Sequence, residues 1–328
     1  MPRVILAGDV GGTKTELALY VPGASPRSPI REHRAASGDY PSLEALVREF
    51  LEGAGARPAR AVFGIAGPVV ENRVEATNLP WITDGTALGA ALGGARVTLI
   101  NDLEAAAWGL AVLGGRDLEI LQPGVPAHGN RALIAAGTGL GEAVVVRDGD
   151  SWLPVASEGG HADFAPRDPL EDDLLRWLRA KYGRASWERV LSGRGLADLY
   201  RFMGETGRGA EPAGAGKRFA EAVDPAALVT EMALDGSCER ALLALKKWVE
   251  IYGAEAGNLS LKALAVGGVF VGGGIAPRML PVFRAGHFLR GFTAKGRLTP
   301  LLERIPAAMI LDSRSALWGA AAYAMERG

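Results

Sequence analysis

The feature that most constrains the fold is a glycine-rich strand–turn–strand pattern that occurs twice along the chain. In the first copy, Gly8-Asp-Val-Gly-Gly-Thr13 separates two apolar runs within residues 4–20. In the second copy, Gly137-Thr-Gly139 separates two apolar runs within residues 131–146. Such patterns are typical of β-hairpins, and the N–H groups of a glycine turn bind anions because a phosphate can approach the backbone closely. The two hairpins predict a duplicated α/β architecture with a nucleotide between its halves.

Both hairpins differ from the better known phosphate-binding motifs. The first is similar to a P-loop, but Thr13 stands where that motif requires glycine, and residues 15–20 alternate like a strand. The spacing Gly137-x-Gly-x-Gly141 nearly matches a dinucleotide fingerprint, but a strand-like run follows it as well. Asp9 would repel a phosphate, so it fits a phosphate site only if Mg²⁺ lies between them. The alternative is a plain hairpin in which Asp9 and the glycines form the turn.

The segment Val97–Gly109 predicts a buried strand that leads into a closely packed helix. Asn101 and Asp102 lie at the junction of the two. In open α/β sheets, ligands bind outside the carboxyl ends of the strands, so both side chains are candidates for a site. The alternative is that Asp102 is only the N-cap of the helix and accepts hydrogen bonds from its first N–H groups.

Three further groups of residues are candidates for ligand binding. Glu158 and His161 are separated only by two glycines, so both side chains can reach one small molecule. They suit the hydroxyl groups of a polyhydroxylated ligand; a metal pair is conceivable, but no second His or Cys lies nearby in sequence. Glu188 is an acid flanked by apolar residues. Gly272-Gly-Gly274 follows a strand-like run and predicts bare backbone against which a base or ribose can lie.

Length and composition limit the class of protein. A chain of 328 residues usually forms two domains, and a net charge of −1 gives no general attraction to nucleic acid or anionic lipid. Cys238 is the single cysteine, which excludes an internal disulfide framework and a cysteine-rich zinc site. The N-terminal apolar run is too short for a signal peptide, and the uncharged run 263–277 is too short to span a bilayer. We therefore expect a soluble cytoplasmic enzyme.

The alternation of strands and helices predicts where the domains begin and end. It continues through residue 109, which indicates one α/β domain in this half of the chain. Small residues dominate both the helix after Asp102 and the helix after Asp312, so we expect these helices to pack closely and to form a hinge. The expected domains are a small α/β domain, 1–109 plus 310–328, and a large α/β domain, 110–309.

Six motifs together resemble those of bacterial glucokinases, which belong to the actin-like sugar kinase superfamily. The resemblance covers nearly the whole chain and is weakest over 204–217. The related repressor/open-reading-frame/kinase (ROK) sugar kinases usually carry a zinc-binding cysteine cluster, which a chain with one cysteine cannot form. The motifs are, in order, Gly8-Asp-Val-Gly-Gly-Thr-Lys14, Ile100-Asn-Asp102, Gly137-Thr-Gly-Leu-Gly141, Glu158-Gly-Gly-His-Ala-Asp-Phe-Ala-Pro166, Trp187-Glu-Arg-Val-Leu-Ser-Gly193 and Gly272-Gly-Gly-Ile-Ala-Pro-Arg278.

The resemblance implies a two-domain, actin-like (ribonuclease H-like) α/β fold with a nucleotide and sugar cleft between the domains. It also implies ATP-dependent phosphorylation of the glucose 6-hydroxyl, with Asp102 as the catalytic base and Asn101 as a sugar ligand beside it. Glu158, His161 and Glu188 would bind the other hydroxyl groups. The residues implied in nucleotide binding are Gly8, Asp9, Val10, Gly11, Gly12, Thr13, Gly137, Thr138, Gly139, Gly272, Gly273 and Gly274.

The expected cofactors are ATP and Mg²⁺, with Asp9 holding the metal ion through a water molecule. We also expect a homodimer that binds sugar and nucleotide but no nucleic acid and no membrane. Two alternatives remain at this point. One is a kinase for another hexose, such as fructose, mannose or an amino sugar; the other is an actin-like ATP-binding protein that transfers nothing to a sugar.

Overall fold

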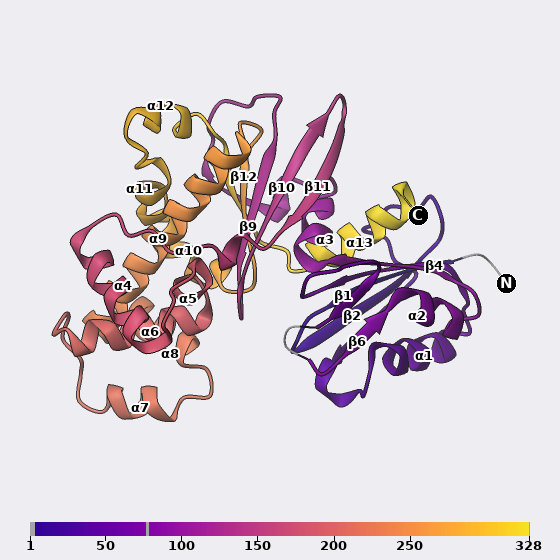
Figure 1. Cartoon of the computed structure of the whole chain (residues 1–328), viewed down its shortest axis with the longest axis horizontal. Coiled ribbons are helices and arrows are strands. Elements are labelled where there is room, and N and C mark those ends of the chain that lie inside the picture. Colours follow the sequence, from indigo (N-terminus) through magenta and orange to yellow (C-terminus); the bar gives the residue numbers. More distant parts are fainter. Residues whose placement is uncertain (1–3, 77–78, 328) are drawn as a thin grey trace. The chain divides into compact units, whose positions relative to one another are not determined.

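The computed structural model describes residues 4–76 and 79–327. The chain divides into two compact units, which we describe separately (Figure 1). Unit 1 comprises Met1–Asp117, Leu153–Ala156 and Asp312–Gly328, and unit 2 comprises Leu118–Trp152 and Ser157–Leu311. Both units contain a β-sheet and several helices, which confirms the α/β class predicted from the sequence.

The sheet of unit 1 has the strand order β3-β2-β1-β4-β7. Strands β1, β4 and β7 are parallel to one another, whereas β2 and β3 are antiparallel to their neighbours, so the first glycine hairpin is confirmed. The register places Asp9 beside Gly64, and Gly64 beside Ile100. The carboxyl ends of the three parallel strands therefore meet at one edge of the sheet. The strands are β1 (Val4–Val10), β2 (Lys14–Tyr20), β3 (Arg31–Ala36), β4 (Pro58–Ile65) and β7 (Arg96–Asn101), and a separate hairpin is formed by β5 (Arg73–Glu75) and β6 (Ile82–Asp84).

Helices cover both faces of this sheet (Figure 1). Helices α1 (Leu43–Ala54) and α2 (Gly85–Ala91) lie on one face, and α3 (Asp102–Gly109) and α13 (Ser315–Glu326) lie on the other. The division follows the alternation of side chains along β1. Leu6 packs in the cluster that includes residues of α1, and its neighbour Ile5 packs in the cluster that includes residues of α3 and α13.

Helices α3 and α13 pack as closely as their small residues predict. A Cβ atom on Gly109 would overlap the backbone of Ser315, and one on Gly319 would overlap the carbonyl oxygen of Ala105. Close packing of the two helices is confirmed, and both lie in unit 1. Their role as a hinge stays a prediction.

The second sheet, which belongs to unit 2 apart from Leu153–Ala156 of β11, has the strand order β11-β10-β9-β12-β13-β8. Strands β9, β12 and β13 are parallel, and β10 returns antiparallel to β9, which confirms the second glycine hairpin. The strands are β8 (Leu118–Gln122), β9 (Arg131–Ala136), β10 (Leu140–Asp148), β11 (Ser151–Ser157), β12 (Val269–Gly272) and β13 (Ala307–Ile310).

Helix α9 is the central element of unit 2. Its side chains Trp248 and Tyr252 are fully buried, and Cys238, directly before the helix, is buried as well. A Cβ atom on Gly253 would overlap the carbonyl oxygen of Phe288, so glycine is what allows α11 to lie against α9. The helices are α4 (Pro169–Tyr182), α5 (Trp187–Val190), α6 (Gly193–Glu205), α7 (Ala215–Glu221), α8 (Pro225–Leu234), α9 (Glu239–Ala263), α10 (Leu280–Arg284), α11 (His287–Thr293) and α12 (Thr299–Leu302).

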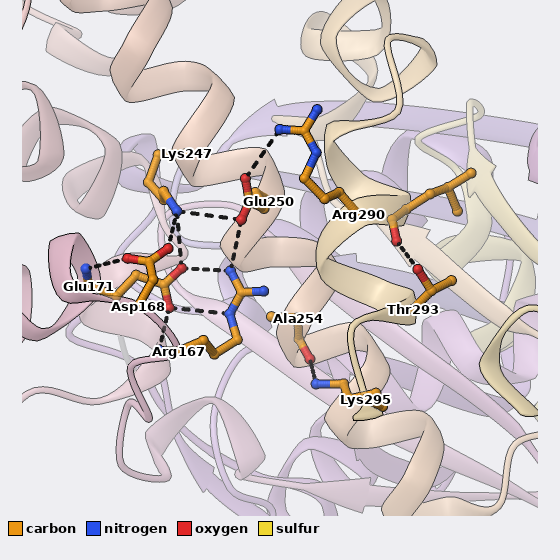
Figure 2. Close-up of polar contacts among 10 residues, drawn as sticks. Arg167, Asp168, Glu171, Lys247, Glu250, Ala254, Arg290, Thr293 and Lys295 are labelled. Carbon is orange, nitrogen blue, oxygen red and sulfur yellow. Dashed lines mark hydrogen bonds and ion pairs between the residues drawn. The ribbon is translucent and has the colours of Figure 1, made fainter. Parts of the chain in front are cut away.

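A network of ion pairs joins α4 and its N-terminal residues to α9 (Figure 2). The Lys247 ammonium lies 2.7 Å from Asp168, 3.4 Å from Glu171 and 3.4 Å from Glu250. Arg167 lies 2.6 Å from Glu171 and 3.4 Å from Glu250. The three carboxylates lie within 4.8 Å of one another, as metal ligands do, but Lys247, Arg167 and Arg290 already balance their charges. We therefore assign the cluster to the attachment of α4 and not to a metal site.

None of the helices in the described residues combines the length and the apolar composition needed to cross a membrane.

Candidate active site

The turn of the first hairpin is shorter than the sequence predicts. Strand β1 continues through Val10, so Gly8, Asp9 and Val10 belong to the strand, and the turn consists of residues 11–13. The Gly11 N–H donates to the Lys14 carbonyl oxygen at 3.0 Å. A Cβ atom on Gly8 would overlap the ring of Phe63, so the glycine there makes room for a core side chain. The bare backbone available to a ligand is therefore that of the 11–13 turn.

Asn101, and not Asp102, is the N-cap of α3. The Asn101 Oδ1 atom accepts hydrogen bonds from the N–H groups of Leu103 at 2.8 Å and Glu104 at 3.3 Å. Its Nδ2 atom donates to the Gly67 carbonyl oxygen at 3.1 Å, so the side chain is fixed from both ends. The alternative in which Asp102 is only the N-cap is thus wrong. Asp102 is the first residue of the helix, and its Oδ1 atom accepts from the Leu103 N–H at 2.9 Å.

Carboxylates gather where β1 and β7 end. Burial, together with the charges of Asp102 and Glu16, raises the pKa of Asp9 to about 7, and Lys14 opposes this shift. A Cβ atom on Gly64, between the two strands, would lie 3.6 Å from the Cα atom of Asp102. Asp9 and Asp102 thus form an acidic pair at the edge where open α/β sheets bind their ligands. A cation held there would lower the cost of keeping both groups ionised.

The second glycine turn, residues 137–139, is held by the segment that carries Glu188. The Leu140 N–H donates to Glu188 Oε2 at 3.1 Å, and the Gly193 N–H donates to the Gly137 carbonyl oxygen at 3.0 Å. A Cβ atom on Gly139 would overlap the Glu188 carboxylate, whereas one on Gly137 would meet nothing within 4 Å. The turn is therefore packed against Glu188 on one side and open on the other.

The loop from Glu158 to His161 lies directly on β10. A Cβ atom on Gly160 would overlap the Leu140 carbonyl oxygen, and one on Gly159 would overlap the Glu142 carboxylate, so both glycines allow this close approach. The side chains of Glu158 and His161 are each 53% exposed, and Nε2 of the imidazole lies 3.8 Å from Oε2 of the carboxylate. The two candidate groups therefore point into solvent-accessible space side by side.

Leu140 is the residue at which the candidate groups of unit 2 meet. Its N–H group binds Glu188, its carbonyl oxygen contacts Gly160, and it directly follows the 137–139 turn. The structure thus places Glu158, His161 and Glu188 at the beginning of β10, next to the 137–139 turn, which is a candidate anion-binding turn. Asp9, Asn101 and Asp102 form the corresponding set in unit 1.

The third glycine turn, residues 272–274, lies next to the second. Strand β12 is parallel to β9, and Gly272 is in register with Ala135. Gly273 has a positive φ of 85°, and a Cβ atom there would overlap the Ala136 carbonyl oxygen, so glycine is required twice over. A Cβ atom on Gly274 would meet nothing within 4 Å. Each turn therefore leaves open space over bare backbone at one residue, Gly137 in the second and Gly274 in the third, and such backbone can lie against a nucleotide.

Two buried polar residues near these turns, Glu142 and Tyr252, are not among the candidates that the sequence indicates. Tyr252 of α9 bonds to the strand ends that carry the second and third turns. Glu142 lies in β10 behind the 158–161 loop, and burial together with the neighbouring Glu255 raises its pKa to about 8. The signal for Glu142 was its place as an acid directly before the apolar run Ala143–Val146. No local signal points to Tyr252, because its partners are more than 100 residues away in β9 and 20 residues away in β12.

The relatives of the chain identify its family. The family model described as Glucokinase matches residues 6–327. The chain belongs to the glucokinase family. The glucokinase of Trichormus variabilis is 41% identical to it over 334 residues, which cover 97% of this chain and 98% of that protein.

Solved structures are similar to this glucokinase-family chain over nearly its whole length. The glucokinase of an Antarctic psychrotroph has a TM-score of 0.82 and 30% identity, with 98% of each chain covered. The ROK family glucokinase of Streptomyces griseus, in complex with glucose and AMPPNP, has a TM-score of 0.63 and 21% identity, covering 98% of this chain and 99% of that one. The second likeness shows the fold alone. Together they confirm the actin-like sugar kinase fold.

Proposed function

We propose that this protein transfers the terminal phosphoryl group of ATP to the 6-hydroxyl of glucose. Membership of the glucokinase family supports the activity and the substrate. The observation that carries the proposal is the meeting of two kinds of group at Leu140. A carboxylate and an imidazole suited to sugar hydroxyls lie there beside a glycine turn suited to phosphates.

Asp102 is the proposed general base. Phosphoryl transfer depends mainly on positioning and charge stabilisation, with a carboxylate placed to accept the proton of the attacking hydroxyl. Because Asn101 caps α3, the carboxylate of Asp102 is not needed to start the helix. Asn101 has one further Nδ2 proton, which we assign to a sugar hydroxyl. Glu158, His161 and Glu188 bind the remaining hydroxyl groups and select the sugar.

The glycine turns are the proposed nucleotide site. Residues 11–13 and 137–139 would hold the phosphates, and residues 272–274 would hold the adenosine. The open space at Gly137 and Gly274 supports this assignment. Since Gly8 and Val10 lie within β1, their contribution is to position the turn.

The residues around Asp9 fit a magnesium ion. Mg²⁺ prefers carboxylate and phosphate oxygens and keeps several of its waters, which suits an indirect contact with Asp9. When bound, the ion neutralises the charge of the ATP phosphates. The pKa of Asp9 is raised by burial and by the charges of Asp102 and Glu16, and a cation bound there would oppose this shift. With the ion bound, Asp9 would be ionised and would hold it through a water molecule.

We further propose that the protein is of the non-ROK type and acts as a cytoplasmic homodimer. The single, buried cysteine supports the first point, because a ROK-type zinc cluster needs several. The other two points rest on the resemblance of its motifs to bacterial glucokinases.

The test is a coupled assay of ADP release across a panel of hexoses, with Mg²⁺ present. We expect the highest kcat/KM for glucose and a product that glucose-6-phosphate dehydrogenase oxidises. A higher kcat/KM for fructose, mannose or an amino sugar would correct the substrate. ATP binding without sugar-dependent ADP release would show a binding protein instead of a kinase. Loss of turnover on chelation, restored by added Mg²⁺, is expected for the metal.

A further inference from the structure

Strands β9 and β12 end side by side, and each leads directly into a glycine turn. Gly272, the last residue of β12, is in register with Ala135, and Gly273 lies so close to Ala136 that only glycine fits. Two turns that bind one ligand must keep a fixed spacing. Sheet pairing joins the two strands as far as Ala135 and Gly272, and beyond that point the backbone contact between Gly273 and Ala136 prevents closer approach.

One side chain of α9 adds a side-chain connection at the point where this strand pairing stops. The hydroxyl oxygen of Tyr252 accepts a hydrogen bond from the Ala136 N–H at 2.9 Å. The same hydroxyl lies 3.2 Å from the Ile134 carbonyl oxygen and 3.4 Å from the Gly272 carbonyl oxygen, and its single proton can serve either. The hydroxyl thus contacts the residue before the 137–139 turn and the first residue of the 272–274 turn.

The surroundings hold Tyr252 in this position. The residue is fully buried, and its ring packs against Trp248, Phe283 and Phe288 with centroid distances of 5.1, 6.0 and 6.2 Å. Because Tyr252 is fully buried among these aromatic rings, its hydroxyl has no contact with bulk solvent. A tyrosine in such surroundings is costly unless its hydroxyl is bonded, and here the partners are backbone groups of the two strand ends.

We propose that Tyr252 is a positioning residue for the nucleotide: its hydroxyl fixes the 137–139 and 272–274 turns relative to each other so that both engage one ATP molecule. The proposal rests on the nucleotide site proposed above. Without the hydroxyl, the Ala136 N–H loses its partner where water cannot reach it, so the strand end must shift or fluctuate. ATP binding would then have to order the turns, which weakens affinity.

The experiment compares Tyr252→Phe with Tyr200→Phe in the full-length protein. Tyr200 is a matched control because it is buried in the same unit and its hydroxyl bonds to Glu211 instead of a glycine turn. AMPPNP binding with Mg²⁺ and glucose binding are each measured by calorimetry, and KM for ATP is measured by ADP release. We expect Tyr252→Phe to weaken AMPPNP binding about tenfold, with glucose binding within about twofold of the wild type. Tyr200→Phe should change neither.

Unchanged AMPPNP affinity in Tyr252→Phe, or an equal loss in both variants, would overturn the proposal. Failure of the wild type to bind AMPPNP would instead overturn the proposed function. If Tyr252→Phe does not fold, the proposal is tested by the hydrogen-exchange rate of the Ala136 amide in the wild type. The Ala136 amide should then exchange as slowly as those in the middle of β9, and fast exchange would contradict the proposal.

Discussion

Replacing Glu188 with alanine should weaken the binding of both substrates. The carboxylate is assigned to a sugar hydroxyl, and its Oε2 atom also accepts the Leu140 N–H at 3.1 Å, directly after the 137–139 turn. Hydrogen bonds to a charged acceptor contribute about 1.5–3 kcal/mol, and the half-buried position of Glu188 favours the lower end. A loss of about 1.4 kcal/mol corresponds to a tenfold rise in Kd. We therefore expect AMPPNP affinity to fall about tenfold and glucose affinity to fall at least as much.

Two further variants separate these effects. In Glu188→Gln, the amide oxygen can still accept the Leu140 N–H, so AMPPNP affinity should stay within about threefold of the wild type while glucose affinity falls. In Glu158→Ala, the lost side chain is half exposed and contacts His161 instead of the turn, so only glucose affinity should fall. Calorimetry with each ligand alone measures both affinities. The reasoning fails if Glu188→Ala binds AMPPNP as tightly as the wild type, because the carboxylate would then not support the turn.

Two further predictions concern stability. Burial and the neighbouring Glu255 raise the pKa of Glu142 from about 4.5 in the unfolded chain to about 8 in the folded protein, and Lys262 opposes this shift. Between these two pH values, the folded state holds a proton that the unfolded state has lost. Glu142 should therefore lower the free energy of unfolding between about pH 5 and 8, by at most about 1.4 kcal/mol per pH unit. Denaturant titrations of Glu142→Gln should show a shallower fall than the wild type, and part of the fall should remain because the pKa of Asp9 is also raised, to about 7. Gly319→Val should lower the free energy of unfolding by about 1–3 kcal/mol at any pH, because the new side chain would overlap the Ala105 carbonyl oxygen. An unchanged midpoint of denaturant unfolding would show that α3 and α13 can separate freely.

Local sequence patterns predicted the elements of this fold well. Glycine between apolar runs predicted both hairpins, and the small residues of the helices after Asp102 and Asp312 predicted their close packing. The motifs also predicted which residues of unit 2 gather, because Glu158, His161 and Glu188 all lie at the beginning of β10. These features depend on neighbours in sequence or on a motif whose residues act together.

Features that depend on distant contacts were not predictable. Asn101 and Asp102 are both good N-caps, and the choice follows from the Asn101 bond to Gly67, 34 residues away. Gly8 was assigned to a turn because nothing nearby in sequence shows that the Phe63 ring fills its face. The hydrogen bonds of Tyr252 to Ala136 and Gly272 form only because α9 packs against both β9 and β12.

The turnover of Asp102→Asn tests the central claim most directly. The substitution preserves the size of the side chain, and α3 keeps its N-cap because Asn101 is untouched. Glu104→Gln is a matched control, since it removes another carboxylate from the first turn of the same helix. We predict that Asp102→Asn lowers kcat by about 10²-fold or more with a much smaller change in the Kd for glucose, while Glu104→Gln keeps near-normal kcat. Near-normal kcat in Asp102→Asn would contradict the assignment of Asp102 as the base that accepts the glucose hydroxyl proton.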